Sequence, residues 1–341
     1  MLYDSAHDAG DPHCFVRLAG FLPHAETWLK LEAQNPAGSI KIKAARAMIT
    51  AAEEAGRIGP GTRLIESTSG NLGIALASIC AARGYPITLV TDPNANYRSV
   101  QQMRALGADV VIVDQRDAND GFLGSRIAHI SLKLAADPAL VWLNQYANPA
   151  NVAAHREGTA VEITEGFGVP DRLFVGVGTS GTLMGCLEHF ARIGAATVVV
   201  GVDAVGSVTF GGPAARRLIP GLGSSRVPEI FRRGEHSRYE RMLVPEPDAI
   251  VACRRTAADH GLLVGGSTGT VLAAVRASAH RIPAGSRVLA VSPDHGHAYL
   301  DTVYDDTWVA AHYGPDFLKD IGGRPLPPAR TPVTAESESS K

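Results

Sequence analysis

Short hydrophobic runs alternate with alanine-rich segments along most of the chain. The runs at residues 87–91 and 287–292 are continuous, without polar alternation, which is typical of strands buried on both faces of a parallel sheet. Segments such as 72–83 have the alanine-rich composition of helices. The alternation predicts an α/β protein with two sheet-forming regions.

The pattern also predicts where the individual elements lie. The expected strands are 62–66, 87–91, 109–113, 172–177, 197–202 and 287–292, and the expected helices are 72–83, 98–105, 183–193, 247–260 and 271–279. Gly84 and Gly107 directly follow two of these helices. They stand where a glycine commonly ends a helix in the left-handed conformation.

The length of 341 residues predicts two domains rather than one core. We place a smaller, mobile domain at residues 46–150. The larger domain is expected to combine residues 1–45 with residues 151–320. Residues 324–341 contain prolines and a serine- and glutamate-rich run, and we expect them to form a disordered tail.

Composition narrows the class of protein. With 45% hydrophobic and 19% charged residues and a net charge of −2, the chain has the profile of a soluble globular enzyme and lacks the basic excess of a nucleic-acid-binding protein. The four cysteines are widely spaced, which argues against a zinc site or a disulfide framework. Neither a secretory signal nor a bilayer-spanning segment is evident, so we expect a cytoplasmic enzyme without membrane partners.

Lys41 is the first residue with candidate chemistry. It follows Ser39, the expected N-cap, at the start of an alanine-rich segment. A positive charge in a first helical turn costs roughly 0.3–1 kcal/mol, because the helix N-terminus is already electropositive. Lys41 is therefore either a solvated lysine on a frayed turn or an amine with a lowered pKa that forms a Schiff base.

Residues 66–73 form a polar loop before a predicted helix. The loop contains three hydroxyls, two glycines and an amide, so several donors can converge on an anion such as a carboxylate. A capping loop with surplus polar residues is the alternative.

A glycine-rich turn at residues 176–183 follows a predicted strand and opens a helix. It satisfies G-x-G-x-x-G, and Asp203 stands at the end of the next strand, where a dinucleotide fold binds the ribose. The turn also carries the hydroxyls of Thr179, Ser180 and Thr182, which favour the terminal phosphate of a smaller cofactor.

A third glycine-rich stretch, residues 265–270, precedes another helix. Its hydroxyls serve either as helix caps or as partners of a ligand. If the stretch faces a pyridine ring, Ser267 offers a neutral hydroxyl to the ring nitrogen. A hydroxyl there withdraws electrons weakly and favours elimination at a β-carbon.

Five motifs occur in a recognisable order. They are NPAGSIK at 35–41, TSGN at 68–71, QYANPAN at 145–151, GTSGT at 178–182 and GSTG at 266–269. Over residues 15–305 the chain thereby resembles the fold-type II pyridoxal-phosphate enzymes of the cysteine synthase and cystathionine β-synthase family. The resemblance implies two open, twisted, mostly parallel sheets with flanking helices, as in the tryptophan synthase β subunit, and a homodimer.

The resemblance also implies roles for individual residues. Lys41 holds pyridoxal 5′-phosphate as a Schiff base, Asn71 lies near the cofactor's 3′-oxygen, and Ser267 faces its ring nitrogen. The cofactor phosphate is bound by Gly178, Thr179, Ser180, Gly181 and Thr182. The amino-acid substrate is bound by Thr68, Ser69, Gly70, Asn71 and Gln145. No metal is implied.

Three departures from a typical cysteine synthase bear on the substrate. Tyr146, Ser180 and Leu72 stand where that enzyme has Phe, Gly and Thr. Two of the changes add a hydroxyl, and a buried polar group usually has a polar partner, so Tyr146 and Ser180 are expected to contact a more polar substrate. Arg126 is a candidate for binding a phosphate leaving group, or else a surface arginine on a helix.

Residues 206–225 also depart from the family pattern and contain Arg216 and Arg217. Together with Ser-Gly-Asn-Leu at 69–72 and Tyr146, this segment resembles the branch that makes N-(2-amino-2-carboxyethyl)-L-glutamate from O-phospho-L-serine and L-glutamate, towards 2,3-diaminopropionate for siderophores and antibiotics. One of the two arginines is then expected at a glutamate carboxylate, and a solvated pair is the alternative. A cysteine synthase using O-acetylserine or O-phosphoserine with sulfide is the near alternative for function, and a nicotinamide oxidoreductase is a remote one.

Overall fold

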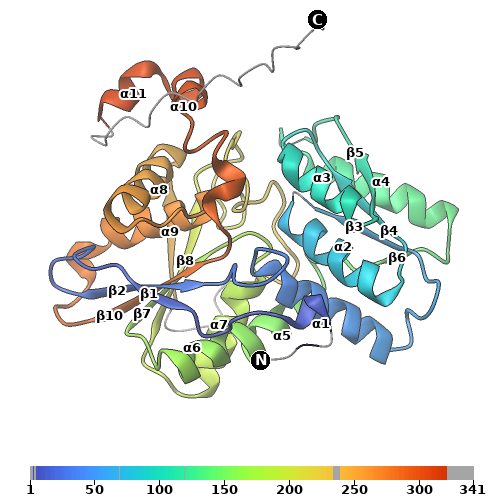
Figure 1. Ribbon diagram of the computed structural model, residues 1–341, viewed down its shortest axis with the longest axis horizontal. Coiled ribbons are helices and arrows are strands. Elements are labelled where there is room, and N and C mark those ends of the chain that lie inside the picture. Colours follow the sequence, from blue (N-terminus) through green and yellow to red (C-terminus); the bar gives the residue numbers. More distant parts are fainter. Residues whose placement is uncertain (1–2, 4, 69, 119, 233–238, 321–341) are drawn as a thin grey trace, which may run out of the picture.

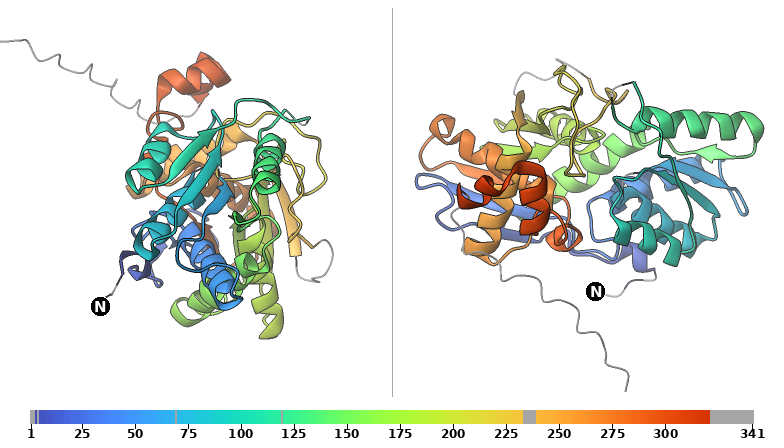
Figure 2. Two further views of the ribbon diagram at one scale, coloured as in Figure 1. Left: turned by 90° about the vertical axis from the view of Figure 1, so that its right-hand side faces the viewer. Right: turned by 90° about the horizontal axis from the view of Figure 1, so that it is seen from above.

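The computed structural model describes Tyr3 and residues 5–68, 70–118, 120–232 and 239–320. Ser69 and the expected tail at 324–341 lie outside the described residues. Two sheets with flanking helices stand side by side (Figure 1; Figure 2). The expectation of an α/β fold with two open, mostly parallel sheets is confirmed.

The larger sheet has six strands in the order β1-β2-β10-β7-β8-β9. Their bounds are β1 (Phe15–Arg17), β2 (Glu26–Leu31), β7 (Arg172–Gly176), β8 (Val198–Ala204), β9 (Tyr239–Val244) and β10 (Arg287–Ser292). Only the edge strand β1 runs antiparallel to its neighbour; the other pairs are parallel. At the centre, Ala290 pairs with Leu29 on one side and Phe174 on the other.

Helices bury both faces of this sheet at its centre, which is why β7, β8 and β10 lack polar alternation. Leu173 and Val175 of β7 face one core, whereas Phe174 faces another, shared with α8 and α9. The helices are α5 (Pro149–Ala154), α6 (Ala160–Gly166), α7 (Gly181–Arg192), α8 (Glu246–His260) and α9 (Gly266–Ala277), with a π-helical turn η2 (His155–Thr159) between α5 and α6. The first three lie below the sheet and the last two above it in Figure 1.

The smaller sheet is parallel, with strands β5 (Asp109–Ile112), β4 (Ile87–Thr91), β3 (Leu64–Ser67) and β6 (Val141–Trp142) in that order. Leu64 and Leu89 pack into a core shared with α1 (Lys41–Glu54), α2 (Asn71–Arg83) and α3 (Tyr97–Ala105). Ile65 and Val90 point to the opposite face and pack against Ile130 of α4 (Leu123–Ala136).

Most predicted helices and strands are present, but some of them begin or end at other residues than the sequence pattern predicts. β4 and β10 have the expected bounds, and Gly84 takes the left-handed conformation directly after α2. Helix α9 begins at Gly266, five residues before its expected start at 271, because the glycine-rich stretch is itself helical. Helix α1 spans the predicted boundary at 45/46, and the division into two domains stays a prediction.

The expectation that Ser39 caps α1 is wrong. The helix begins at Lys41 with Ile40 as its N-cap, and no side chain caps it. Ser39 instead forms an isolated β-bridge with Asp294, and the Ile40 amide donates to Pro293 O at 2.8 Å. The segment after β10 therefore fixes the start of the helix.

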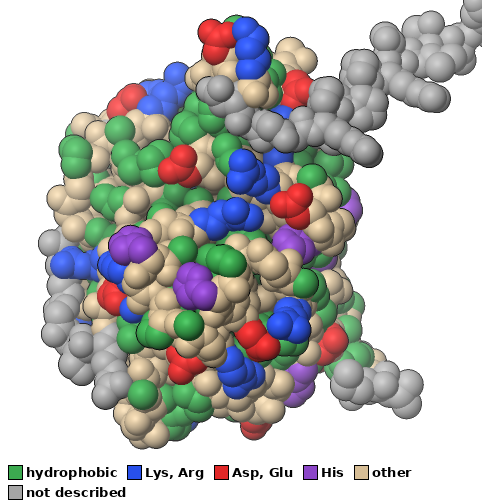
Figure 3. All heavy atoms as spheres, turned by 90° about the vertical axis from the view of Figure 1, so that its left-hand side faces the viewer, with side chains coloured by type: hydrophobic (Ala, Val, Ile, Leu, Met, Phe, Trp, Pro, Cys, Tyr) green, Lys and Arg blue, Asp and Glu red, His purple; other side chains and the backbone are tan. Residues whose placement is uncertain are grey.

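Short helical elements complete the described chain. They are η1 (Ala6–Asp8) before β1, the turns η3 (Ala279–Arg281) and η4 (Gly296–Tyr299) on either side of β10, and α10 (Asp306–Tyr313) and α11 (Pro315–Asp320) after η4. No helix among the described residues is both long and apolar enough to cross a bilayer. Positive and negative side chains are interspersed on the face shown in Figure 3, in keeping with the small net charge.

Candidate active site

Four helices begin at the carboxyl ends of the parallel strands, between the two sheets. Their first residues are Lys41, Asn71, Gly181 and Gly266. The amide groups of a first helical turn have no partner inside the helix, so each start carries partial positive charge. Such an arrangement suits an anionic ligand at the strand ends.

Lys41 is half-buried and lines a cleft together with Thr68 and Gly178. Burial lowers the pKa of its amine to about 8, while the carboxylate of Asp294 acts in the opposite direction. The alternative interpretation of Lys41 as a freely solvated lysine is therefore wrong. The neutral form of Lys41 is accessible near physiological pH, as a Schiff-base lysine requires.

Asp294 is a buried acid that the sequence analysis missed. Its Oδ2 accepts hydrogen bonds from Asn71 Nδ2 at 2.8 Å and from the hydroxyl of Tyr299 at 2.9 Å. Burial raises the pKa of Asp294 against the effect of these two bonds. Its position directly after a strand of the parallel sheet, β10, was the available signal.

The loop from Gly178 to Thr182 has the backbone geometry of a tight anion site. Ser180 adopts a left-handed conformation with φ of 74° directly before α7. A side chain at Gly181 would place its Cβ 2.2 Å from Asn151 Oδ1, and one at Gly178 would approach the carbonyl of Gly221. Because both positions are glycine, no side chain covers the backbone there, and an anion can approach it closely.

A chain of amides joins this loop to the polar loop after β3. Gln145 Nε2 donates to Ser67 O at 2.8 Å, and Asn151 Nδ2 donates to Gln145 O at 2.8 Å. The same Asn151 nitrogen donates to Thr179 Oγ1 at 3.0 Å. The structure therefore connects Gln145 to both candidate binding loops.

Thr68 stabilises its own loop. Its hydroxyl oxygen accepts hydrogen bonds from the backbone N–H groups of Gly70 and Gly73, at 3.1 and 2.9 Å. Gly70 precedes α2 with φ of 152°, a conformation that favours glycine. Ser69, between them, lies outside the described residues, and substrate binding by this loop stays a prediction.

The available donors fit pyridoxal phosphate. The hydroxyl oxygen of Ser180 is buried and has no hydrogen-bond partner among the described residues, and the buried hydroxyl of Ser267 lies beside the Asp294 carboxylate. A buried polar atom without a partner is uncommon unless a ligand satisfies it. Ser180 belongs to the glycine-rich loop that suits a phosphate, Ser267 offers one neutral hydroxyl for a ring nitrogen, and Lys41 supplies the amine.

Arg126 is buried in α4 rather than exposed, so its interpretation as a surface arginine is wrong. Its side chain lines the same cleft as Lys41. Nε lies 3.4 Å from Asp92 Oδ2, and Nη1 has no hydrogen-bond partner among the described residues. Tyr146, half-buried, lines this cleft as well, and burial raises the pKa of its hydroxyl.

The two arginines of the 206–225 segment have different environments. Arg216 is exposed, whereas Arg217 is half-buried, with Nη1 buried and without a hydrogen-bond partner among the described residues. Burial lowers the pKa of Arg217, and Asp203 opposes that effect. The 206–225 segment also contacts the loop between β5 and α4, since Ser225 Oγ donates to Asp117 Oδ2 at 3.1 Å.

Known proteins share this architecture and sequence. The family model described as pyridoxal-phosphate dependent enzyme matches residues 14–294. The N-(2-amino-2-carboxyethyl)-L-glutamate synthase of Cupriavidus metallidurans is 43% identical over 290 residues, which are 84% of this chain and 84% of that protein. The enzyme of the same name from Ralstonia nicotianae is 42% identical over 287 residues, with the same two coverages.

A solved structure agrees with these matches. The crystal structure of O-ureido-L-serine synthase has a TM-score of 0.81 and 32% identity, and the match covers 91% of this chain and 100% of that one. The dinucleotide interpretation of the turn at 176–183 is thereby overturned, and with it the nicotinamide oxidoreductase. The chain belongs to the pyridoxal-phosphate-dependent enzymes of the cysteine synthase family, which carry out replacement reactions at the β-carbon of amino acids.

Proposed function

We propose that the enzyme joins L-glutamate to the three-carbon unit of O-phospho-L-serine and releases phosphate. The Cβ–O bond of phosphoserine breaks, and a bond forms between Cβ and the amine nitrogen of glutamate. The product is N-(2-amino-2-carboxyethyl)-L-glutamate. The name shared by the two bacterial relatives at 43% and 42% identity supports this proposal.

The observation that carries the proposal is the buried guanidinium of Arg126 in the cleft that also contains Lys41. Only Asp92 is paired with it among the described residues, and Nη1 remains without a partner. A guanidinium matches a phosphate group in both charge and geometry. We therefore assign Arg126 to the phosphate of phosphoserine, with the Tyr146 hydroxyl beside it.

Arg217 is the better candidate of the arginine pair for a glutamate carboxylate. It lines the cleft with a buried, unpartnered Nη1, whereas Arg216 is exposed. A half-buried guanidinium whose Nη1 is buried without a hydrogen-bond partner is expected to pair with an anionic ligand. Sulfide would not use this guanidinium.

Bound pyridoxal phosphate supplies an electron sink that acidifies the substrate's Cα–H and allows the β-substituent to leave. The Nζ atom of Lys41, with a pKa near 8, takes the Cα proton as general base. The loop at 68–71 holds the substrate's α-carboxylate, and its engagement draws the smaller domain over the cleft and excludes water. The family resemblance further supports a cytoplasmic homodimer.

The experiment compares nucleophiles at a fixed phosphoserine concentration. Phosphate release is measured in the presence of L-glutamate, sulfide, L-aspartate or no nucleophile, and the products are identified by mass spectrometry. We expect glutamate to give the highest kcat/KM. A higher value with sulfide would favour the cysteine synthase instead. Arg217→Ala is expected to raise the KM for glutamate with little change in the KM for phosphoserine.

A further inference from the structure

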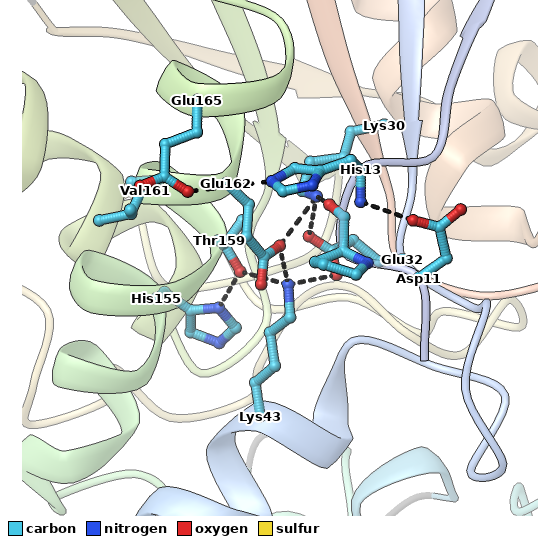
Figure 4. Close-up of polar contacts among 12 residues, drawn as sticks. Asp11, His13, Lys30, Glu32, Lys43, His155, Thr159, Val161, Glu162 and Glu165 are labelled. Carbon is cyan, nitrogen blue, oxygen red and sulfur yellow. Dashed lines mark hydrogen bonds and ion pairs between the residues drawn. The ribbon is translucent and has the colours of Figure 1, made fainter. Parts of the chain in front are cut away.

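A buried ionic cluster joins β2, α1 and α6. It consists of Lys30 and Glu32 from β2 and its end, Lys43 from α1 and Glu162 from α6, which point towards one another in Figure 4. Lys43 Nζ lies 2.7 Å from Glu32 Oε2 and 2.5 Å from Glu162 Oε2. Lys30 Nζ lies 2.9 Å from the same Glu162 oxygen.

The cluster keeps Lys43 charged. Burial alone would lower the pKa of Lys43, but the carboxylates of Glu32 and Glu162 raise it above the ordinary value. The Lys43 ammonium is therefore a donor only. Besides the two carboxylates, its nitrogen reaches Thr159 Oγ1 at 3.4 Å.

From Thr159 the contacts continue to the glycine-rich loop. Thr159 Oγ1 lies 3.0 Å from His155 Nδ1, and His155 Nε2 lies 3.3 Å from Thr182 Oγ1. The π-helical turn η2 carries both Thr159 and His155, and such turns are frequent at functional sites. Gly185 lets α7 approach this turn, since a Cβ there would lie 2.7 Å from His155 Cβ.

These contacts indicate a direction for each hydrogen bond along the chain from Lys43 to Thr182. His155 is fully buried, and burial together with Lys41 and Lys43 holds its pKa well below the ordinary value, so the ring is neutral. A neutral imidazole has one donor and one acceptor nitrogen. Of the two groups that Thr159 Oγ1 contacts, the Lys43 ammonium can only donate, so His155 Nδ1 is the one that can accept the Thr159 hydrogen. The ring proton then stands on Nε2 and points at Thr182.

We propose that Lys43 and Thr159 are positioning residues that hold the proton of His155 on Nε2, so that Thr182 accepts there and directs its own hydroxyl hydrogen at the cofactor phosphate. This inference rests on the proposed binding of that phosphate by residues 178–182. With the opposite tautomer, Thr182 would donate to His155 and present only lone pairs to the anion. Each group in the series Lys43, Thr159, His155 and Thr182 thus donates a hydrogen bond to the next, and Thr182 donates to the phosphate.

The tautomer can be observed directly in the full-length holoenzyme labelled with ¹⁵N-histidine. The His155 signals are assigned by their loss in His155→Gln. We expect a directly bonded proton on Nε2 and none on Nδ1. A proton on Nδ1 would overturn the inference.

Cofactor affinity provides the second readout. Thr182→Val is expected to raise the dissociation constant of pyridoxal phosphate about tenfold or more, and Thr159→Val about fivefold, as expected for hydrogen bonds to or behind a charged group. Thr159→Ser keeps the hydroxyl and should restore the affinity. Thr164→Val is the matched control, because the Thr164 hydroxyl donates to the Ala160 and Val161 carbonyls instead.

The double variant separates the possible failures. If Thr159 acts through Thr182, adding Thr159→Val to Thr182→Val causes no further loss. Independent, additive losses would overturn the inference and leave the phosphate site intact. An unchanged affinity in Thr182→Val would overturn the phosphate site itself, and the inference with it. Thermal melting of each holoenzyme shows whether a loss reflects misfolding.

Discussion

Asn71 Nδ2 donates a 2.8 Å hydrogen bond to Asp294 Oδ2, and this bond joins the first residue of α2 to the segment that follows β10. It connects the smaller sheet to the larger one at the start of the helix. The same carboxylate accepts from Tyr299 and raises the pKa of Lys41 against the effect of burial. Asp294 thus orients one candidate cofactor ligand and tunes the amine of another.

The first prediction concerns cofactor uptake as a function of pH. The neutral amine attacks the aldehyde, and with a pKa of about 8 its fraction rises from about one tenth at pH 7 to about nine tenths at pH 9. The rate at which cofactor-free enzyme binds pyridoxal phosphate should therefore rise about tenfold over this interval. Stopped-flow absorbance measures it.

Asp294→Asn tests the cause of this profile. The amide keeps a hydrogen-bonding side chain but removes the charge that raises the pKa of Lys41, so the midpoint should move to lower pH. Asp301→Asn, at an exposed position, is the control and should leave the midpoint in place. Identical midpoints in Asp294→Asn and the wild type would contradict this role for Asp294.

Lys41→Ala should abolish both the visible absorbance of the bound cofactor and turnover. Loss of the general base alone is expected to lower kcat by about 10³-fold. Lys133→Ala, which removes an exposed lysine from α4, should change neither. A Lys41→Ala enzyme that keeps its colour and its rate would rule out the assignment.

Arg126→Ala should affect phosphoserine far more than O-acetylserine. Losing a charge-assisted contact to phosphate is expected to lower kcat/KM for phosphoserine by roughly 100-fold, and that for acetylserine only a few-fold. Arg126→Lys keeps a charge beside Asp92 and should lose less. Arg104→Ala, exposed on α3, is the control.

Equal losses with the two substrates would remove Arg126 from phosphate binding. They would point instead to a structural role for its ion pair with Asp92, which lies 3.4 Å away. Thermal melting of each variant separates this outcome from simple unfolding.

Glu66 makes stability depend on pH. Burial raises the pKa of its carboxyl from 4.5 to about 7, against hydrogen bonds from Trp142 Nε1 and the Ser67 amide. The folded state therefore binds the proton more tightly than the unfolded state, and the free energy of unfolding falls as pH rises from 4.5 to 7. Between pH 5 and pH 8 this loss is about 2 kcal/mol.

Glu66→Gln should abolish this loss, because the amide carries no charge and still accepts from Trp142. Urea denaturation at pH 5 and pH 8 should show the variant gaining about 2 kcal/mol relative to the wild type over that interval. Glu54→Gln, at an exposed position, serves as the control. A constant difference between Glu66→Gln and the wild type at the two pH values would contradict the assignment.

Local pattern predicted the elements that are buried on both faces. β4 and β10 are continuous hydrophobic runs with the expected bounds. The strands β1 and β2 were not predicted, because β1 is a three-residue edge strand and β2 carries Lys30, which is buried with ion pairs that no local pattern reveals. The start of α1 was misplaced for a similar reason, since Asp294 pairs with Ser39 from far along the chain.

The candidate site shows the same contrast between features that local sequence reveals and features that depend on distant contacts. The glycine-rich loops and Lys41 can be recognised from the composition of a few neighbouring residues. Asp294, Glu66 and His155 were missed because their environments arise from contacts between distant segments. His155 and Thr159 do lie four residues apart after the motif at 145–151, a spacing that places them on one helical face and was the available signal.

The central claim is that the amine of glutamate replaces the phosphate of phosphoserine. Incubating the enzyme with O-phospho-L-serine and ¹⁵N-labelled L-glutamate, and weighing the products by mass spectrometry, tests it most directly. The account predicts one molecule of N-(2-amino-2-carboxyethyl)-L-glutamate, carrying the ¹⁵N label, for each phosphate released. Phosphate released with only pyruvate and ammonia, and no labelled adduct, would contradict it.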